Sequence, residues 1–359
     1  MSVLRLNNIS KTYPGQTNPA VADFNFSLQE NEIITLLGPS GCGKTTILRM
    51  IAGFVKPDRG NIYIKNEKVA GNGIMKSPEK RKVGMMFQDY ALFPHLTVAE
   101  NILFGLEKKL NQKEQQKRVK KMLELVGLMG FENKYPHQLS GGQKQRVALS
   151  RALCREPAVI LMDEPFSSLD ERMREEMRKE IKDILNQSNI PAIIVSHDRE
   201  DAFSLSDRLA VMKAGRIEQT GTPQEIFARP QNKFVADFAS RSNLIQLSDI
   251  ENKKNGEICG YCQLGEISPL PEGCLRNEIE KEQSLLAIRP DAFEIDPGGD
   301  ITARVKDYIY YGSYVEAHLL VETTCENIEI NAHLDQIPGE IGSEVSLNFC
   351  SENCWVIEE

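Results

Sequence analysis

Short, uninterrupted runs of apolar residues recur along the first two thirds of the chain, and each run ends at glycine or polar residues. The runs cover residues 32–38, 83–88, 158–163 and 192–197. Runs of this length and β-branched content predict buried strands of an α/β sheet. Apolar residues at helical spacing follow the first run, at Ile47, Leu48 and Ile51, and predict a helix there.

The pattern changes after about residue 240. Short β-rich runs then stand between glycine and proline turns, at residues 285–289, 301–305, 315–321, 345–349 and 355–357. Strands of this length and spacing predict a small barrel or sandwich. We therefore expect an α/β domain over residues 1–240 and an all-β domain over residues 241–359.

A glycine-rich loop joins the first predicted strand to the predicted helix. It reads Gly-Pro-Ser-Gly-Cys-Gly-Lys-Thr-Thr and matches the P-loop pattern in the strand–loop–helix context that this pattern requires. Backbone N–H groups and the helix N-terminus suit phosphate oxygens, Lys44 suits the β- and γ-phosphates, and the Thr45 hydroxyl suits Mg²⁺. The residues that we expect to bind ATP here are Gly38, Pro39, Ser40, Gly41, Cys42, Gly43, Lys44, Thr45 and Thr46. Kinases, GTPases and motors share this loop.

Polar side chains stand where three other predicted strands end. Asp163 and Glu164 end one run, His197 ends another, and Gln88 ends a third. Ligands of open α/β sheets bind at the carboxyl ends of strands. We expect Thr45, Gln88 and Asp163 to hold Mg²⁺, and Glu164 to orient or deprotonate the attacking water. His197 would then contact the γ-phosphate, and Lys44, Gln88, Glu164 and His197 are the predicted catalytic residues.

A second anion site is predicted at Leu-Ser-Gly-Gly-Gln, residues 139–143. Ser140 stands where a helix N-cap is expected, and Gly141 and Gly142 leave the first amides of an uncapped helix start open to an anion. The P-loop already surrounds the phosphates from one side. This second site is therefore best explained if Ser140, Gly141, Gly142 and Gln143 bind the γ-phosphate of ATP on another copy of the chain.

Together these strings resemble the ATP-binding cassette (ABC) family over residues 1–240. The resemblance implies a P-loop ATPase domain with antiparallel β and α-helical subdomains, which works as a homodimer. It also assigns Tyr13, in Lys-Thr-Tyr-Pro, to stacking on adenine, and Ser168, Leu169 and Asp170 to contacts across the dimer interface. ATP and Mg²⁺ are the implied cofactors.

The all-β part resembles the OB-type regulatory domain of importer ATPases through Leu-Ala-Ile-Arg-Pro-Asp at residues 286–291. The strings at residues 135–142 and 196–202 most resemble ferric-ion importer ATPases. The resemblance implies an ABC-type ferric-ion translocase that couples ATP hydrolysis to uptake through separate permease chains and, indirectly, a solute-binding protein. Motors for polyamine, sulfate, phosphonate or sugar import remain alternatives, as does a soluble ABC ATPase outside transport. The Leu-Ser-Gly-Gly-Gln string argues against a small-molecule kinase.

Charge and hydropathy narrow the possible partners. Residues 241–359 carry 8 Lys and Arg against 23 Asp and Glu, whereas residues 1–240 carry 35 against 28. The acidic part argues against nucleic-acid binding. No run approaches a membrane span and no signal peptide is evident, so the membrane part of a transporter would be another chain. The resemblance to importer ATPases then implies a peripheral protein on the cytoplasmic face of the inner membrane. Residues 92–98, before a helix expected at 100–110, either receive a permease helix or pack in the core.

Six of the eight cysteines fall in the acidic part of the chain. Cys259 and Cys262, and likewise Cys350 and Cys354, have spacings that permit metal binding or redox sensing. The first pair lacks the second Cys pair of a zinc site, and buried or incidental cysteines are the simpler interpretation. The other four are Cys42, Cys154, Cys274 and Cys325, and a cytosolic ATPase would keep all of them reduced.

Overall fold

The computed structural model describes residues 2–104, 106, 111–167, 169–252, 258–270, 284–323 and 327–358 of the 359-residue chain. Its contacts group the chain into two compact units, Met1–Pro223 and Gln224–Glu359. The expected division after residue 240 rests on the change in sequence pattern and stays a prediction. Ser168, Cys274 and Cys325, singled out above, lie outside the described residues.

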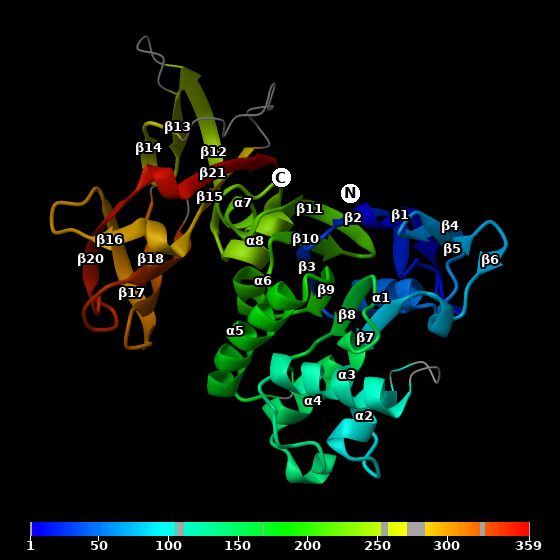
Figure 1. Ribbon diagram of the computed structural model, residues 1–359. Coiled ribbons are helices and arrows are strands. Elements are labelled where there is room, and N and C mark those ends of the chain that lie inside the picture. Colours follow the sequence, from blue (N-terminus) through cyan, green and yellow to red (C-terminus); the bar gives the residue numbers. More distant parts are fainter. Residues whose placement is uncertain are drawn as a thin grey trace. The chain divides into compact units, whose positions relative to one another are not determined.

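A six-stranded sheet forms the centre of the first unit (Figure 1). In spatial order its strands are β11 (Arg216–Gly221), β10 (Arg208–Lys213), β3 (Ile33–Leu37), β9 (Ala192–Ser196), β8 (Val159–Asp163) and β7 (Val83–Met86). The strands from β10 to β7 are parallel to their neighbours, and only β11 pairs antiparallel in this sheet as described. All four strands predicted from apolar runs are present, although β7 ends two residues before Gln88.

Both faces of this sheet are covered, which explains why its central strands are apolar without alternation. Along β8, Val159 and Leu161 pack into one core and Ile160 and Met162 into the other. Helix α1 (Lys44–Ala52) contributes to the first core. The second core receives α4 (Gly141–Leu153), α5 (Glu171–Ser188) and α6 (Arg199–Leu205). The parallel sheet is therefore buried between two cores, and the candidate site lies at the C-terminal ends of its strands.

Two further layers complete the first unit. An antiparallel sheet contains β2 (Val21–Gln29), β1 (Ser2–Lys11), β4 (Arg59–Ile64), β5 (Glu67–Gly71) and β6 (Ile74–Met75). Helices α2 (Val98–Phe104) and α3 (Gln112–Leu125) pack with α4, and Figure 1 shows the three grouped together. The helix expected at 100–110 therefore begins earlier, at Val98, and residues 107–110 lie outside the description. Antiparallel and helical subdomains accompany the parallel sheet, as the resemblance implied.

Two five-stranded sheets enclose the core of the second unit. The first contains β14 (Gly265–Ile267), β13 (Ile258–Cys262), β12 (Asn243–Asn252), β15 (Ser284–Ile288) and β21 (Cys354–Glu358). The second contains β16 (Phe293–Ile295), β20 (Glu344–Phe349), β17 (Ile301–Tyr310), β18 (Val315–Val321) and β19 (Ile328–Leu334). Every predicted β run of this region is a strand, so the all-β assignment is confirmed.

Two short helices precede these strands, α7 (Pro223–Ala228) and α8 (Lys233–Ser240). Ala236 of α8 packs with Leu285, Ala287 and Ile357 of the first β-sheet of the second unit. By packing, α8 therefore belongs with the all-β part. None of the helices in the described ranges is long and apolar enough to cross a membrane.

Candidate active site

The glycine-rich loop joins β3 to α1 as the sequence predicts. A Cβ atom at Gly43 would lie 2.2 Å from the Ala20 carbonyl oxygen, and Gly43 has a φ of 105°, so only glycine fits there. The Lys44 side chain is buried, and its Nζ donates to the carbonyl oxygens of Gly38, at 2.6 Å, and Pro39, at 2.9 Å. The ammonium group is therefore held at the loop by two acceptors that a phosphate can replace.

Thr45 and Asp163 meet across the gap between α1 and the end of β8. The Thr45 hydroxyl donates to Asp163 Oδ1 at 2.9 Å. Burial raises the pKa of the Asp163 carboxyl, and the hydrogen bond from Thr45 opposes that rise. A hydroxyl and a carboxylate in contact are hard oxygen ligands of the kind that Mg²⁺ prefers, so this pair fits the predicted ion.

Glu164 lies between the other two predicted polar residues. Its Oε1 is 3.1 Å from His197 Nδ1, and its Oε2 accepts a hydrogen bond from Gln88 Nε2 at 3.5 Å. Glu164 has a φ of 46°, which is uncommon for a residue with a side chain, and its N–H donates to the Val195 carbonyl of β9. The ends of three neighbouring strands thus bring Glu164, His197 and Gln88 together.

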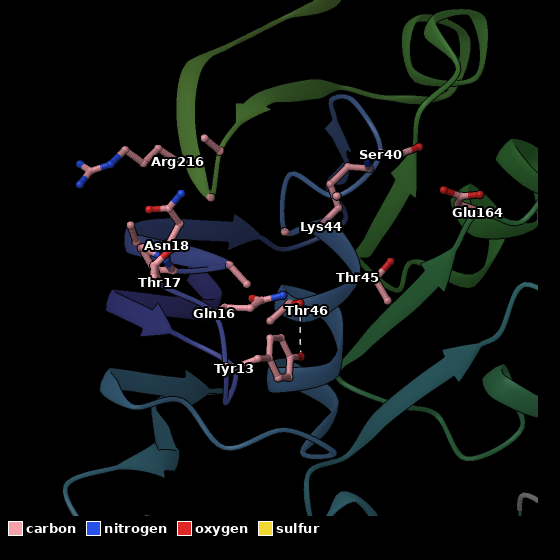
Figure 2. A pocket seen from close by; sticks show the side chains of 18 residues that line it. Tyr13, Gln16, Thr17, Asn18, Ser40, Lys44, Thr45, Thr46, Glu164 and Arg216 are labelled. Carbon is pink, nitrogen blue, oxygen red and sulfur yellow. Dashed lines mark hydrogen bonds between the residues drawn. The ribbon is translucent and has the colours of Figure 1, made fainter.

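An open pocket of about 910 Å³ lies over the glycine-rich loop (Figure 2). Its lining includes Tyr13, Lys44, Thr45, Thr46 and Glu164, and the Tyr13 hydroxyl is 3.4 Å from Thr46 Oγ1. An aromatic ring and the phosphate loop therefore face the same pocket. The predicted stacking of Tyr13 on adenine remains a prediction.

Sequence reasoning missed part of this pocket. The segment after Tyr13 and the turn between β10 and β11 also line it, through Gly15, Gln16, Thr17, Asn18, Pro19, Ala20, Ala214, Gly215 and Arg216. The sequence could have indicated three of these residues, because Gln16, Thr17 and Asn18 follow closely after Tyr13, which was predicted to bind adenine. Arg216 carried no such signal, because contacts between distant segments bring it to the pocket: β10 pairs with β3, and the Gly215 N–H donates to the Cys42 carbonyl.

The Leu-Ser-Gly-Gly-Gln segment forms the predicted helix start, but its N-terminus is capped. Ser140 Oγ accepts from the Gln143 N–H at 3.3 Å, and Gln143 Oε1 accepts from the Ser140 N–H at 3.1 Å. Ser140 is thus the N-cap that the sequence predicts, whereas the expectation of an uncapped helix start is wrong, because this reciprocal capping box already uses two donors. Gly142 also has a packing reason, since a Cβ atom there would lie 2.9 Å from Met177 Sδ.

The capped segment and the pocket are separate features of one chain. The described residues that line the pocket do not include Ser140, Gly141, Gly142 or Gln143. Ser140 is exposed at the start of α4. Two predicted nucleotide-binding elements are thus present, and only one of them faces this pocket.

The described cysteines are free thiols. Cys259 and Cys262 are three positions apart on β13, so their side chains point to opposite faces of the strand. Cys259 Sγ is 3.0 Å from Ser268 Oγ, whereas Cys354 Sγ donates to the Ser351 carbonyl. In the part of the chain that the structure describes, no three His, Cys, Asp or Glu residues are placed to hold a metal ion.

A parallel sheet with a glycine-rich loop, a Thr–Asp pair and a Glu–His pair at its carboxyl edge defines a P-loop nucleotide-binding domain. Residues 21–167 match the family model described as ABC transporter, and residues 286–357 match the TOBE domain. The chain is 39% identical to the spermidine/putrescine import ATP-binding protein PotA of Nitrosomonas europaea, over 98% of both chains. It belongs to the ABC transporter family and joins the ATP-binding domain of that family to a TOBE domain.

Other relatives carry different substrate names. The Fe(3+) ions import ATP-binding protein FbpC of Fusobacterium nucleatum is 42% identical over 100% of this chain and 94% of its own. A sulfate/thiosulfate import ATP-binding protein of Chromobacterium violaceum is also 42% identical, over 84% of this chain and 80% of its own. The relatives therefore agree on ATP binding and import and differ on the solute.

Among solved structures, the first unit resembles ATP-binding cassettes. The dimeric, post-hydrolysis structure of the cassette MJ0796 with ADP and Pi is 33% identical, with a TM-score of 0.53, and covers 61% of this chain and 98% of its own. The structure of cbiO1 from Clostridium perfringens, also 33% identical, has a TM-score of 0.58 over 64% of this chain and 91% of its own. The ABC ATPase fold is thereby confirmed.

Proposed function

We propose that this protein is the ATP-hydrolysing motor subunit of a multi-chain ABC importer. The observation that carries the proposal is the meeting of Glu164, His197 and Gln88 beside the pocket that Lys44 and Thr45 line. The full-length similarity to import ATP-binding proteins supports the transport role.

In this mechanism the chain's own residues bind and orient the nucleotide. Tyr13 stacks on adenine, and the loop of Gly38, Pro39, Ser40, Gly41, Cys42 and Gly43 surrounds the phosphates. Lys44 exchanges its two carbonyl acceptors for phosphate oxygens, and Thr46 adds a hydrogen bond. Thr45, Asp163 and Gln88 would hold Mg²⁺, which neutralises charge on the phosphates when bound.

Hydrolysis needs a water molecule aligned with the γ-phosphate. Glu164 accepts a proton from that water or orients it, and its carboxylate is already fixed between His197 and Gln88. His197 contacts the γ-phosphate, so a change at that phosphate reaches Glu164 through their 3.1 Å contact.

A second copy of the chain completes the site. Ser140, Gly141, Gly142 and Gln143 lie away from their own pocket, so they serve the γ-phosphate bound by the partner subunit. The solved dimeric cassette among the structural relatives supports this arrangement. Ser140 and Gln143 would open their capping box to release donors toward the phosphate. ATP binding would then favour a closed homodimer, and hydrolysis would reopen it.

The permease and the solute-binding protein are separate chains in this proposal, and the motor lies on the cytoplasmic face of the inner membrane. Phe93 packs on Phe104 with ring centroids 4.2 Å apart, and Phe104 is 63% exposed. The exposed ring of Phe104, packed on the partly exposed Phe93, supports the docking of a permease helix near residues 92–98. We propose no nucleic-acid partner, because the C-terminal part is strongly acidic.

Ferric iron is the solute that the strings at residues 135–142 and 196–202 favour, and one full-length relative bears that function. Spermidine or putrescine is the second candidate, because several similar relatives are named for their import. The motor role is common to both candidates.

Uptake by cells whose sole copy of the gene encodes Glu164→Gln tests motor and solute together. The cells are offered labelled ferric iron or labelled putrescine, with the wild-type gene as control. Loss of iron uptake alone supports ferric import, and loss of putrescine uptake alone assigns the polyamine branch. Unchanged uptake of both would contradict the motor role for these solutes.

A further inference from the structure

An ion-pair cluster joins α5 to the start of α6, directly behind His197. Arg174 Nη1 donates to Asp198 Oδ2 at 3.0 Å, and Arg178 Nε donates to Asp201 Oδ1 at 2.8 Å. The Arg178 and Asp201 side chains are only 7% and 6% exposed. We call these four residues the α5–α6 cluster. None of them belongs to the predicted nucleotide-binding set.

The cluster fixes the residues on both sides of His197. Ser196 Oγ donates to Asp201 Oδ2 at 3.1 Å and accepts from the Asp198 N–H at 3.0 Å. Asp198 also caps α6, since its Oδ1 accepts from the Asp201 N–H at 3.2 Å. The backbone that carries His197 is therefore tied to Asp201 from the preceding residue and from the following one.

The other end of the cluster leads back to Glu164. Helix α5 begins where the segment after Glu164 ends, at an N-cap formed by Asp170, whose side chain accepts from the Met173 N–H. Arg174 lies one helical turn beyond this cap. A single helix thus follows the loop that carries Glu164 and holds, through its arginines, the loop that carries His197.

Stability alone is a weak explanation for such a cluster. Burying two charges costs desolvation free energy, and apolar side chains of similar volume often stabilise a core as well or better. A planar guanidinium that hydrogen-bonds a carboxylate does, however, fix direction as well as distance. The cluster is therefore best explained as a means of fixing the relative position of the two segments that it joins.

We propose that Arg174 and Arg178 are positioning residues for hydrolysis, which hold His197 at its 3.1 Å contact with Glu164 by anchoring Asp198 and Asp201 to α5. The inference rests on the proposed function, because it gives the arginines a role only through His197. Neither arginine touches the nucleotide in this account. A displacement of about 1 Å at a reacting group can lower a rate on the order of 100-fold, so a small shift of His197 is enough to matter.

The test uses the full-length chain and compares Arg174→Gln with Arg172→Gln. Arg172 is on the same helix, but it is 92% exposed and pairs only with Glu176, at 3.8 Å, among the contacts of the described residues. We expect Arg174→Gln to lower kcat for ATP hydrolysis about 10-fold or more, with KM and the Kd for ATP unchanged. Arg172→Gln should match wild type, and Arg174→Lys should recover part of the lost rate.

A second variant keeps the test independent of folding defects. Asp198→Asn removes the charge that pairs with Arg174 and retains the cap of α6, because asparagine caps helices as well as aspartate does. Asp198→Asn should lower kcat as Arg174→Gln does, and the double variant should be no slower than either single variant. Additive losses in the double variant would overturn the pairing.

The deciding comparison measures the effect of Arg174→Gln in the wild-type protein and in the His197→Ala variant, by single-turnover phosphate release. If the arginine acts only through His197, Arg174→Gln has no further effect once His197 is absent. An equal loss in both backgrounds would overturn the inference and leave the proposed function standing. If His197→Ala itself does not change kcat, the proposed role of His197 fails first, and the positioning role fails with it. An Arg174→Gln variant as active as Arg172→Gln would also overturn it.

Discussion

At the residue scale, the role in cation binding proposed for Asp163 opposes the stability of the fold. It ends β8, is 9% exposed, and accepts one hydrogen bond from Thr45. Burial raises its pKa, so the native chain ionises this carboxyl less readily than the unfolded chain does. The ionised form of a buried carboxyl lowers stability, and a group destabilised in this way suits the cation-binding role proposed for Asp163.

Asp163→Asn should therefore stabilise the nucleotide-free protein near neutral pH. Because the folded pKa lies above the unfolded value, the wild-type penalty grows as pH rises from about 4 through the raised pKa and then stays constant. We expect the thermal midpoint of the variant to exceed wild type by roughly 1–4 °C at pH 7.5, with a smaller difference near pH 4.5. Differential scanning fluorimetry without nucleotide measures both values.

The matched control is Asp183→Asn, an exposed aspartate on α5. It should leave the thermal midpoint close to wild type at both pH values. An Asp163→Asn variant with the same midpoint as wild type across this range would show that the carboxyl carries no burial penalty. Asp163→Asn, unlike the control, should also lose the stabilisation that Mg²⁺ and ATP give to the wild-type protein.

Residue types and their places at strand ends could be predicted from the sequence, because apolar runs and glycine-rich loops are local signals. The contacts of the side chains could not. Lys44 bonds two carbonyls of its own loop, and Ser140 caps its own helix, because polar groups take the hydrogen-bond partners that the folded chain places nearest to them. Arg216 reaches the pocket through contacts between segments that are distant in the sequence.

At the scale of elements, the helix after the glycine-rich loop depends on one buried arginine. Arg81 is 1% exposed, and its Nη1 donates to the carbonyls of Met50 and Ile51 in the last turn of α1. Its other nitrogens donate to the carbonyls of Lys76 and Val69. Burial lowers the pKa of Arg81 to about 10, so the side chain remains charged at neutral pH. Arg81 thus ties the end of α1 to the segment that leads into β7.

Arg81→Met should destabilise the protein by about 3 kcal/mol, because it leaves several buried carbonyl oxygens without donors. Arg59→Met, at an exposed position of β4, is the matched control and should change little. Urea midpoints of the three proteins, monitored by circular dichroism, measure the difference. Equal midpoints for Arg81→Met and wild type would contradict the role assigned to this side chain.

Strands of the parallel sheet were easier to predict from the sequence than strands of the antiparallel sheet, because the two kinds of strand are buried differently. Strands β3, β8 and β9 are buried on both faces and appear as continuous apolar runs, so the sequence predicts each of them, and it also predicts β7. Strand β10 of the same sheet was not predicted. The antiparallel sheet was implied only by the family resemblance. Its strands β1 and β2 are partly exposed and pair with several register shifts, which interrupt the alternation that marks such strands.

At the scale of the whole molecule, the chain holds two predicted parts of an ATP site, and only one of them lines its pocket. Lys44, Thr45 and Glu164 line the pocket, whereas Ser140 stands at the exposed start of another helix. Local motifs could reveal both parts, but no local signal fixes the distance between them. The proposed homodimer follows from this separation, because an exchanged pair of such parts makes two complete sites.

The most direct test of this account is the mass of the full-length Glu164→Gln protein in solution, measured by light scattering with and without ATP and Mg²⁺. Removal of the proposed base should slow hydrolysis and preserve the ATP-bound state, so we predict a mass that doubles when ATP is added. The same protein with Ser140→Arg should stay monomeric, because the new side chain obstructs the partner's γ-phosphate. A Glu164→Gln protein that remains monomeric at saturating ATP would contradict a site completed by a second copy.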